Sequence, residues 1–245
     1  MKSKNLIILL VILIVVIVAG AVFLFSNKNF IPIALAPNQS AVINIQDKQI
    51  NDNTKPFVIK IVYPYIPGID GFNKMVLDAV NKEINDFKTN SLENDAAVKQ
   101  IDPKGYAAEP REYDLDIGYD KGEIDENIVS VILNVYNFEG GAHGASYFVP
   151  LNYNPKTKKD IQLADLFSGQ SDYLQKISDF CTADLNKQLT KTLGSLDGTY
   201  LADGAGPNAD NFQYFLINKN NIVFYFPQYQ VAFGAAGDFK VILPR

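Results

Sequence analysis

The chain has 245 residues, of which 47% are hydrophobic and 20% charged, and its formal net charge is −5. This composition excludes an intrinsically disordered chain, and an acidic balance without a basic stripe argues against nucleic acid as a partner. The single cysteine, Cys181, excludes an intramolecular disulfide and favours a domain held together by its hydrophobic core.

An uncharged hydrophobic run of 20 residues, 6–25, lies near the N-terminus. A helix of that length rises about 30 Å, which matches the hydrocarbon core of a bilayer. Lys2 and Lys4 precede the run and only Lys28 closely follows it, so the positive-inside rule favours a cytoplasmic N-terminus. We therefore predict a short cytoplasmic tail at 1–5, a transmembrane helix at 6–25, a linker at 26–40, and an extracytoplasmic C-terminal part.

A cleaved signal peptide is the alternative interpretation of this segment. Its hydrophobic region would be about 7–15 residues long, and a small-x-small cleavage site would follow closely. The run here is longer, and Ala34 and Ala36 form such a pattern only well beyond it. No cysteine directly follows the run, which excludes a lipoprotein anchor, so we favour an uncleaved anchor.

The first part of the acidic region predicts two strands and a helix. Alternating apolar and polar residues predict strands at 41–46 and 56–66, with turn residues at 51–54. Apolar residues recurring every three or four positions over 72–87 predict an amphipathic helix, with Asp70 as its N-cap.

The remaining region predicts a long hairpin, a second amphipathic helix and three closing strands. Because short turns join neighbouring strands, we expect antiparallel pairing to dominate. The predicted fold class is α+β, with mostly antiparallel sheets and two amphipathic helices packed on them, after an N-terminal transmembrane helix. The predicted strands are 112–119, 128–138 (central in its sheet), 145–154, 212–217, 221–226 and 239–243; the helix covers 173–189, and 197–211 is predicted to be a loop.

The only histidine, His143, lies among Gly140, Gly141 and Gly144, and these glycines predict a tight turn. Its imidazole could contact a ligand, serve as a general base or bind a metal. A zinc site needs three or four protein ligands, which one histidine and one cysteine do not supply. We expect no metal, no cofactor and no catalytic residue. A turn whose histidine fills a polar niche, and a hydrolase that uses His143 with carboxylates, are the open alternatives.

Several other side chains have a simpler interpretation. Cys181 lies on the apolar stripe of its helix and is predicted to be buried. Asp114 and Asp116 lie two residues apart on one strand, so they should share a solvated face. Tyr229 and Phe233 lie in an irregular segment, and we predict that they form an exposed aromatic surface for ligand binding.

Three segments of the chain carry a family resemblance: YNFEGGAHG at 136–144, LNYNPKTKKDIQLADLF at 151–167, and NFQYFLINKNNIVFYFPQYQVAFGAAG at 211–237. They resemble the C-terminal domain of RsiV-type anti-sigma factors, a domain of unknown function that also occurs with PdaC-type deacetylases. The preceding portion resembles the PdaC-like domain of unknown function. The resemblance implies a PdaC-like α+β domain at 41–138 and an RsiV-like C-terminal domain at 139–245.

The resemblance also implies a binding role in the bacterial cell envelope. RsiV-type receptors bind lysozyme outside the cytoplasm, and the catalysis of the deacetylases belongs to a separate domain. After residue 26 the chain has 20 basic and 27 acidic residues, and this net charge of −7 suits a cationic protein such as lysozyme. Relatives often have P-Y where this chain has Phe233 and Gly234. We expect a membrane-anchored module, not an enzyme, that binds lysozyme or cell-wall glycan; a structural envelope protein is the alternative.

Overall fold

The computed structural model describes residues 43–108, 111–194 and 198–245. These residues belong to one compact unit, Val42–Arg245. The predicted tail, transmembrane helix and linker lie outside the described residues and stay predictions. No helix within the described ranges combines the length and the hydrophobicity that a membrane span requires.

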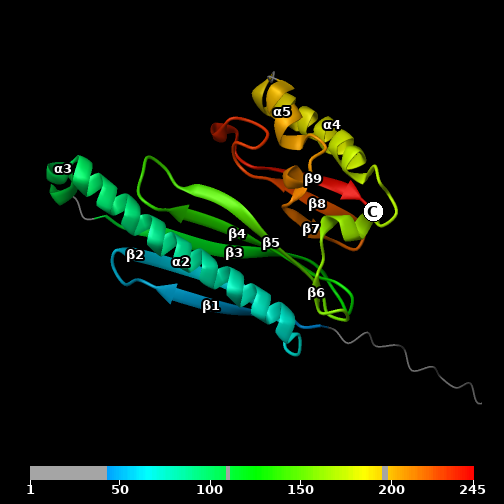
Figure 1. The fold of residues 1–245 in the computed structure, drawn as a ribbon, viewed down its shortest axis with the longest axis horizontal. Coiled ribbons are helices and arrows are strands. Elements are labelled where there is room, and N and C mark those ends of the chain that lie inside the picture. The colour runs from blue at the N-terminus through cyan, green and yellow to red at the C-terminus, as the bar shows by residue number, and fades with distance from the viewer. Residues whose placement is uncertain (1–42, 109–110, 195–197) are drawn as a thin grey trace, which may run out of the picture. The chain divides into compact units, whose positions relative to one another are not determined.

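Six strands form the larger sheet in the order β1-β2-β3-β4-β5-β6 (Figure 1). Neighbouring strands are antiparallel except β2 and β3, which are parallel. A parallel pair needs a crossover connection, and the long helix α2 supplies it and covers one face of the sheet. The bounds are β1 Gln46–Asp52, β2 Phe57–Tyr65, α2 Asp70–Ile101, α3 Pro103–Ala108, β3 Tyr113–Ile124, β4 Val129–Phe138, β5 Ala145–Asn154 and β6 Lys159–Asp160.

Three antiparallel strands form the second sheet, in the order β7-β8-β9. The helix α4 packs against this sheet, and α5 packs against α4 (Figure 1). The fold is thus α+β with two sheets, and the two longest of the four described helices are the predicted amphipathic ones. The bounds are η1 Leu163–Phe167, α4 Tyr173–Leu193, α5 Gly198–Ala205, η2 Ala209–Phe212, β7 Phe215–Ile217, β8 Asn221–Phe226, η3 Gly234–Ala236 and β9 Phe239–Pro244.

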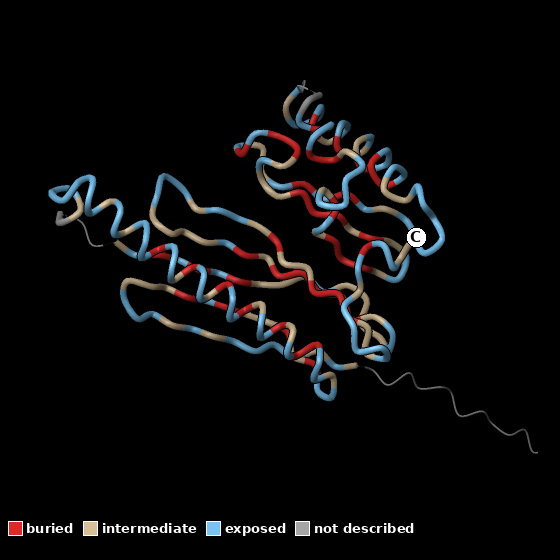
Figure 2. Tube along the Cα trace, viewed as in Figure 1, coloured by how far each residue is buried: buried red, intermediate tan, exposed pale blue. Residues whose placement is uncertain are grey.

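Strand alternation places the first core between the larger sheet and α2. Ile59 and Ile61 of β2 are buried, and they pack in one cluster with Leu115 and Ile117 of β3. Buried and exposed residues also alternate along α2 (Figure 2). On the opposite face of β3, Asp114 and Asp116 are exposed, as predicted. The period-two pattern therefore separates a buried face from a solvated one.

The second core lies between α4 and the three-stranded sheet. Ile177, Cys181, Leu185 and Leu189 recur on one face of α4 and are buried in a cluster with the second sheet. The predicted burial of Cys181 is confirmed. Loss of hydration raises the pKa of its thiol to about 12, and the nearby charge of Asp184 adds to the effect. The thiol is therefore a neutral packing group near neutral pH.

The first strand lies several residues later than predicted. β1 starts at Gln46, whereas the prediction was 41–46, and it includes residues that were expected to form a turn. Its register comes from antiparallel pairing with β2, in which Gln46 faces Tyr65 and Asp52 faces Ile59. β1 is an edge strand whose side chains are mostly exposed, so hydrophobic alternation does not mark its position.

Three other parts of the chain correct the sequence prediction. Asp70 is the first residue of α2 and Ile69 occupies the N-cap, so the carboxylate lies in the first turn, where the helix dipole favours it. The predicted loop at 197–211 contains α5 and most of η2. Leu201 and Ala205 of α5 are buried in the second core, so tertiary packing stabilises a helix despite its glycines. The predicted strand at 212–217 shortens to β7.

Candidate functional site

The predicted glycine turn and His143 lie in the connection between β4 and β5. Gly140 has a φ of 85°, a conformation that favours glycine. His143 is exposed, and its Nδ1 lies 3.0 Å from the carbonyl oxygen of Gly144. Among the described residues, no carboxylate forms a hydrogen bond or an ion pair with the imidazole. The ring therefore lacks the acidic partner that often orients a catalytic histidine, and its role stays a prediction.

The predicted aromatic surface lies in the connection between β8 and β9. Tyr229 is 61% exposed and Phe233 is 46% exposed. The Tyr229 ring lies directly over Gly234, because a Cβ on that glycine would come within 2.1 Å of the ring. Phe233 occupies the N-cap of η3. These rings and His143 come from connections of different sheets, and a shared role in ligand binding stays a prediction.

A groove that no sequence pattern predicted lies where the two sheets meet. The face of the larger sheet opposite α2 is partly covered by the second sheet, through a buried cluster of Ile132, Phe148, Leu216 and Tyr225. Beside this cluster are two hollows of about 700 Å³ and about 600 Å³, here termed together the seam groove. One is lined by Asp47, Val62, Gly118, Tyr119, Asp120, Lys121, Leu216, Asn218 and Tyr225, and the other by Asp116, Gly118, Asp120, Asn134, Val135, Tyr136, Ser146, Phe148, Asp238 and Lys240.

Gly118 and Asp120 of β3 line both hollows. Strand alternation places Asp116, Gly118 and Asp120 on the same face of the sheet. A Cβ built on Gly118 would meet no atom within 4 Å, so the glycine leaves open space at this point. The two hollows therefore adjoin where β3 has no side chain.

Three hydrogen-bonded side chains, those of Asp120, Tyr225 and Lys240, lie at the centre of the seam groove. The Tyr225 hydroxyl donates to the Asp120 carboxylate at 3.2 Å, and the Lys240 ammonium donates to the same oxygen at 3.3 Å. The Lys240 ammonium also lies 4.5 Å from the centre of the Tyr225 ring. Burial raises the pKa of Tyr225 above its ordinary value, and the Asp120 charge adds to this. Tyr225 is therefore a neutral donor that holds Asp120 in place.

The smaller hollow of the seam groove presents an aromatic ring between polar groups. Tyr136 is 44% exposed, and it is the register partner of Asp116 on β3 and of Ser146 on β5. Direct cross-strand partners have Cβ atoms about 4.5–5.5 Å apart, so these three side chains form a row across the strands. Carboxylate, phenol and hydroxyl together both accept and donate hydrogen bonds. This arrangement suits a ligand rich in hydroxyl groups.

Glycines inside strand β3 are the local features of the sequence that could have indicated this groove. Gly118 interrupts the alternation of β3, and a glycine inside a strand often marks the close approach of a ligand or another backbone. Asp238 and Lys240 carry no such signal. Within the described ranges, no group of three or more histidine, cysteine or acidic side chains is arranged to hold a metal ion.

Family models match two parts of the chain. The family model described as deacetylase PdaC matches residues 50–146. The family model described as protein of unknown function (DUF3298) matches residues 164–245. A DUF3298 family member from Bacteroides fragilis has a similar crystal structure, with a TM-score of 0.55, 17% identity, and coverage of 84% of this chain and 91% of that chain. For a DUF3298 family protein from Pseudomonas aeruginosa, the TM-score is 0.50 and the identity is 12%, with coverage of 84% of this chain and 92% of that chain. At these identities the structural likeness concerns the fold alone.

Curated relatives share parts of the sequence. The peptidoglycan-N-acetylmuramic acid deacetylase PdaC of Bacillus subtilis is 24% identical over 202 residues, which are 82% of this chain and 40% of the relative. The immunogenic protein MPT64 of Mycobacterium tuberculosis is 25% identical over 116 residues, which are 47% of this chain and 48% of the relative. An esterase of the same organism is 24% identical over 127 residues, 52% of this chain and 53% of the relative. The chain spans about half the length of these relatives or less.

The comparisons confirm the resemblance seen in the sequence. A PdaC-like segment is followed by a DUF3298 segment. Similarity to PdaC-type and DUF3298 family proteins indicates a cell-envelope-associated protein. The words deacetylase and esterase describe relatives at low identity, and they establish no reaction for this chain.

Proposed function

We propose that this chain, in which a PdaC-like segment precedes a DUF3298 segment, is a membrane-anchored module that binds cell-wall glycan outside the cytoplasm. The seam groove is the observation that carries this proposal. The uncharged run at 6–25 supports the anchor, and the two preceding lysines support the orientation. A relative named as a peptidoglycan deacetylase supports glycan as the ligand class.

The row formed by Asp116, Tyr136 and Ser146 offers what a sugar ring needs. The exposed Tyr136 ring provides a flat apolar surface for the CH groups of a pyranose. Its two register partners provide an acceptor and a donor for the hydroxyl groups that project from the sugar. Ligand-binding sites typically combine an apolar surface with a few polar groups in this way.

The charge of the groove restricts which polymers it accepts. The two hollows together are lined by four carboxylates, those of Asp47, Asp116, Asp120 and Asp238, and by two ammonium groups, those of Lys121 and Lys240. Lys240 is already paired with Asp120. The remaining carboxylates repel phosphate-rich polymers, whereas neutral amino-sugar chains meet no such repulsion. A glycan strand therefore fits the groove better than an anionic wall polymer.

Cosedimentation with purified peptidoglycan sacculi tests this proposal. The full-length chain in a nonionic detergent should sediment with sacculi, and soluble oligosaccharides of N-acetylglucosamine should release it. Microcrystalline cellulose, which lacks the acetamido groups, serves as the control polymer. Sedimentation with cellulose to the same extent, or no sedimentation with sacculi, would contradict glycan recognition.

A cationic protein such as lysozyme is a second candidate ligand, favoured by a separate observation. Tyr229 and Phe233 are exposed aromatic side chains, and the chain after residue 26 carries a net charge of −7. Exposed aromatics provide binding energy, and opposite charge speeds association. Binding of lysozyme to the full-length chain should weaken as salt rises from about 50 to about 300 mM, since screening shortens the Debye length. Absence of binding at high micromolar concentration would exclude this candidate.

A further inference from the structure

A third hollow, of about 500 Å³, lies apart from the seam groove. It is bounded by α2, α3, the segment that enters β3 and the glycine turn after β4, and it shares no lining residue with the seam groove. The lining residues are Val98, Gly105, Arg111, Glu112, Tyr113, Phe138, Gly140 and Gly141. The volume falls within the range of about 300–1,000 Å³ that small-molecule sites occupy. The glycine turn, to which glycan binding assigns no role, thus borders a hollow large enough for a small organic ligand.

Arg111 supplies the cation of this hollow. It is half-buried, and the central carbon of its guanidinium lies 5.7 Å from the centre of the Tyr106 ring. It also lies beside the glycine turn, because a Cβ on Gly140 would come within 3.9 Å of one guanidinium nitrogen. These neighbours restrict the long side chain, so less conformational entropy is lost when a ligand binds to it.

Asp95 of α2 is a carboxylate close enough to Arg111 to interact with its charge, but it has hydrogen-bond donors of its own. One of its oxygens accepts from the Tyr106 hydroxyl at 2.6 Å, and the other accepts from the Tyr113 hydroxyl at 2.6 Å. These two bonds lower the pKa of Asp95, and the charge of Arg111 adds to the effect. Asp95 therefore offsets part of the positive charge, although no ion pair within the described ranges joins it to the guanidinium.

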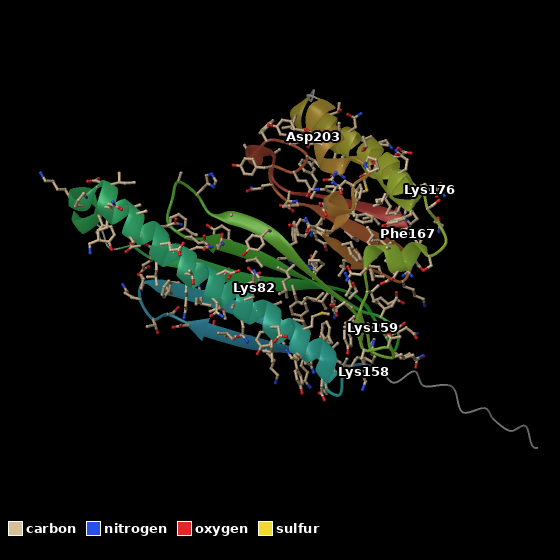
Figure 3. All side chains as sticks on the ribbon, in the orientation of Figure 1. Lys82, Lys158, Lys159, Phe167, Lys176 and Asp203 are labelled. Atoms are coloured by element: carbon tan, nitrogen blue, oxygen red, sulfur yellow. The ribbon has the colours of Figure 1, made fainter. Side chains whose placement is uncertain are left out.

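The carboxylate in the lining, that of Glu112, also has a partner. It is paired with Lys55 at 2.9 Å. Lys82, which lies on α2 in Figure 3, is likewise paired with Asp86. Arg111, in contrast, forms no ion pair with any residue of the described ranges, so its N–H donors are available to a ligand.

The glycine turn adds donors of a second kind. Gly140 and Gly141 line the hollow, and their backbone N–H groups donate to no backbone acceptor in the part of the chain that the structure describes. Gly140 has a φ of 85°, and a Cβ there would come within 2.9 Å of the Tyr113 ring, so a larger residue is excluded. The backbone at this point is therefore open to close approach by a ligand.

Two apolar side chains complete the lining. Val98 of α2 and Phe138 of β4 are both half-buried, so each keeps part of its surface accessible from the hollow. A carbon chain that lies against them is removed from water, which is favourable. The hollow thus combines an apolar surface with a few convergent polar groups, as ligand sites do.

We propose that this hollow binds a carboxylate on a short apolar stem. The planar guanidinium of Arg111 matches the two oxygens of a carboxylate, and the stem lies against Val98 and Phe138. The two protein carboxylates near the guanidinium disfavour a doubly charged ligand such as phosphate. The chemistry is shared by the C-terminus of a peptide and by a free short-chain acid. The proposal is independent of glycan binding, since the two sites share no lining residue.

Calorimetric titration of the full-length chain in a nonionic detergent tests the proposal with matched probes. Nα-acetyl-leucine carries the carboxylate, and Nα-acetyl-leucine amide has the same apolar stem without the charge. The acid should bind at least about tenfold more tightly, because charge-assisted hydrogen bonds are about twice as strong as neutral ones. 4-Methylpentanoate, titrated in parallel, keeps the carboxylate and the stem but lacks the peptide group. Equal or tighter binding of this probe assigns the site to free acids, and weaker binding assigns it to peptide C-termini.

Substitutions of the arginine locate the site. Arg111→Gln removes the charge and should weaken binding of acetyl-leucine at least about tenfold. Arg111→Lys keeps the charge but loses the planar fork, so it should weaken binding about three- to tenfold. Arg245→Gln is the matched control, because Arg245 lies outside the lining and is paired with Glu123. Affinity for N-acetylglucosamine oligosaccharides should not change in Arg111→Gln, so a failure of this site is distinguishable from a failure of glycan binding.

Four results would overturn the proposal. The amide could bind as tightly as the acid, or neither acid could bind at about 10 mM, which is tenfold above the millimolar end of the affinity scale. Sulfate that bound as tightly as the acids would show a site without selectivity for carboxylate. Equal weakening by Arg245→Gln would show that the effect is one of general surface charge. The comparison of probes on the unaltered chain needs no variant, so it decides the question even if a variant unfolds.

Discussion

Replacing Gly118 with phenylalanine is expected to abolish glycan binding at the seam groove and to leave the fold intact. Gly118 lines both hollows, and no other atom lies within 4 Å of the position that a Cβ would take there. A phenyl ring there would fill the junction of the hollows without a clash at Cβ. Aromatic residues are also favoured in strands. Affinity for N-acetylglucosamine oligosaccharides should fall at least about tenfold, which corresponds to about 1.4 kcal/mol.

The measurement is titration of the oligosaccharide into the full-length chain, with thermal unfolding recorded for each variant. Gly141→Phe is the matched control, because Gly141 also has open space around its Cβ but lies in the β4–β5 connection. Gly118→Ala, which adds one methyl group, should produce a smaller loss than the phenylalanine variant. Unchanged affinity in Gly118→Phe, with an unchanged melting temperature, would show that the ligand does not occupy the seam groove.

Replacing Ser130 with alanine is expected to lower the free energy of unfolding by about 2–4 kcal/mol. The Ser130 hydroxyl donates to the side-chain oxygen of Asn152 at 2.6 Å and accepts from the backbone N–H of Ile217 at 2.7 Å. Asn152 in turn donates to the carbonyl of Phe215 at 3.2 Å. Ser130 is fully buried, and each buried polar group left without a partner costs about 1–3 kcal/mol. The network joins β4 and β5 to β7, so the loss would fall on the contact between the sheets.

Ser91→Ala provides a control of the same chemistry. Ser91 of α2 is also fully buried, but its hydroxyl has no hydrogen-bond partner within the described ranges. Removal of that hydroxyl leaves no partner unsatisfied, so stability should stay the same or rise. Urea unfolding of the fragment 42–245 compares the two variants. A cost in Ser130→Ala no larger than that in Ser91→Ala would show that the buried network contributes little.

Local patterns predict the regular elements of this protein where one face of the element is buried. β5 and β8 have the predicted bounds, because apolar alternation and turn residues mark both of their ends. The apolar stripe of α4 predicts the burial of Cys181 for the same reason. Exposure of Tyr229 and Phe233 also follows from the sequence, since their irregular segment lacks a strand pattern.

Prediction from the sequence fails where a distant part of the chain decides the local structure. β1 takes its position from backbone pairing with β2, and α5 forms because its apolar residues meet α4 in the second core. Neither influence is visible in the few residues concerned. Intrinsic preference is weak compared with tertiary contacts of this kind.

The amino-acid sequence alone predicts the α+β fold class, the two-part family resemblance, the buried faces of the main strands and helices, and the acidic balance of the chain. The seam groove, in contrast, follows from the packing of the two sheets. Tyr225 and Lys240 bind the Asp120 carboxylate across 105 and 120 residues of sequence. The physical reason is that burial follows from local periodicity, whereas a groove between two sheets depends on how those sheets pack.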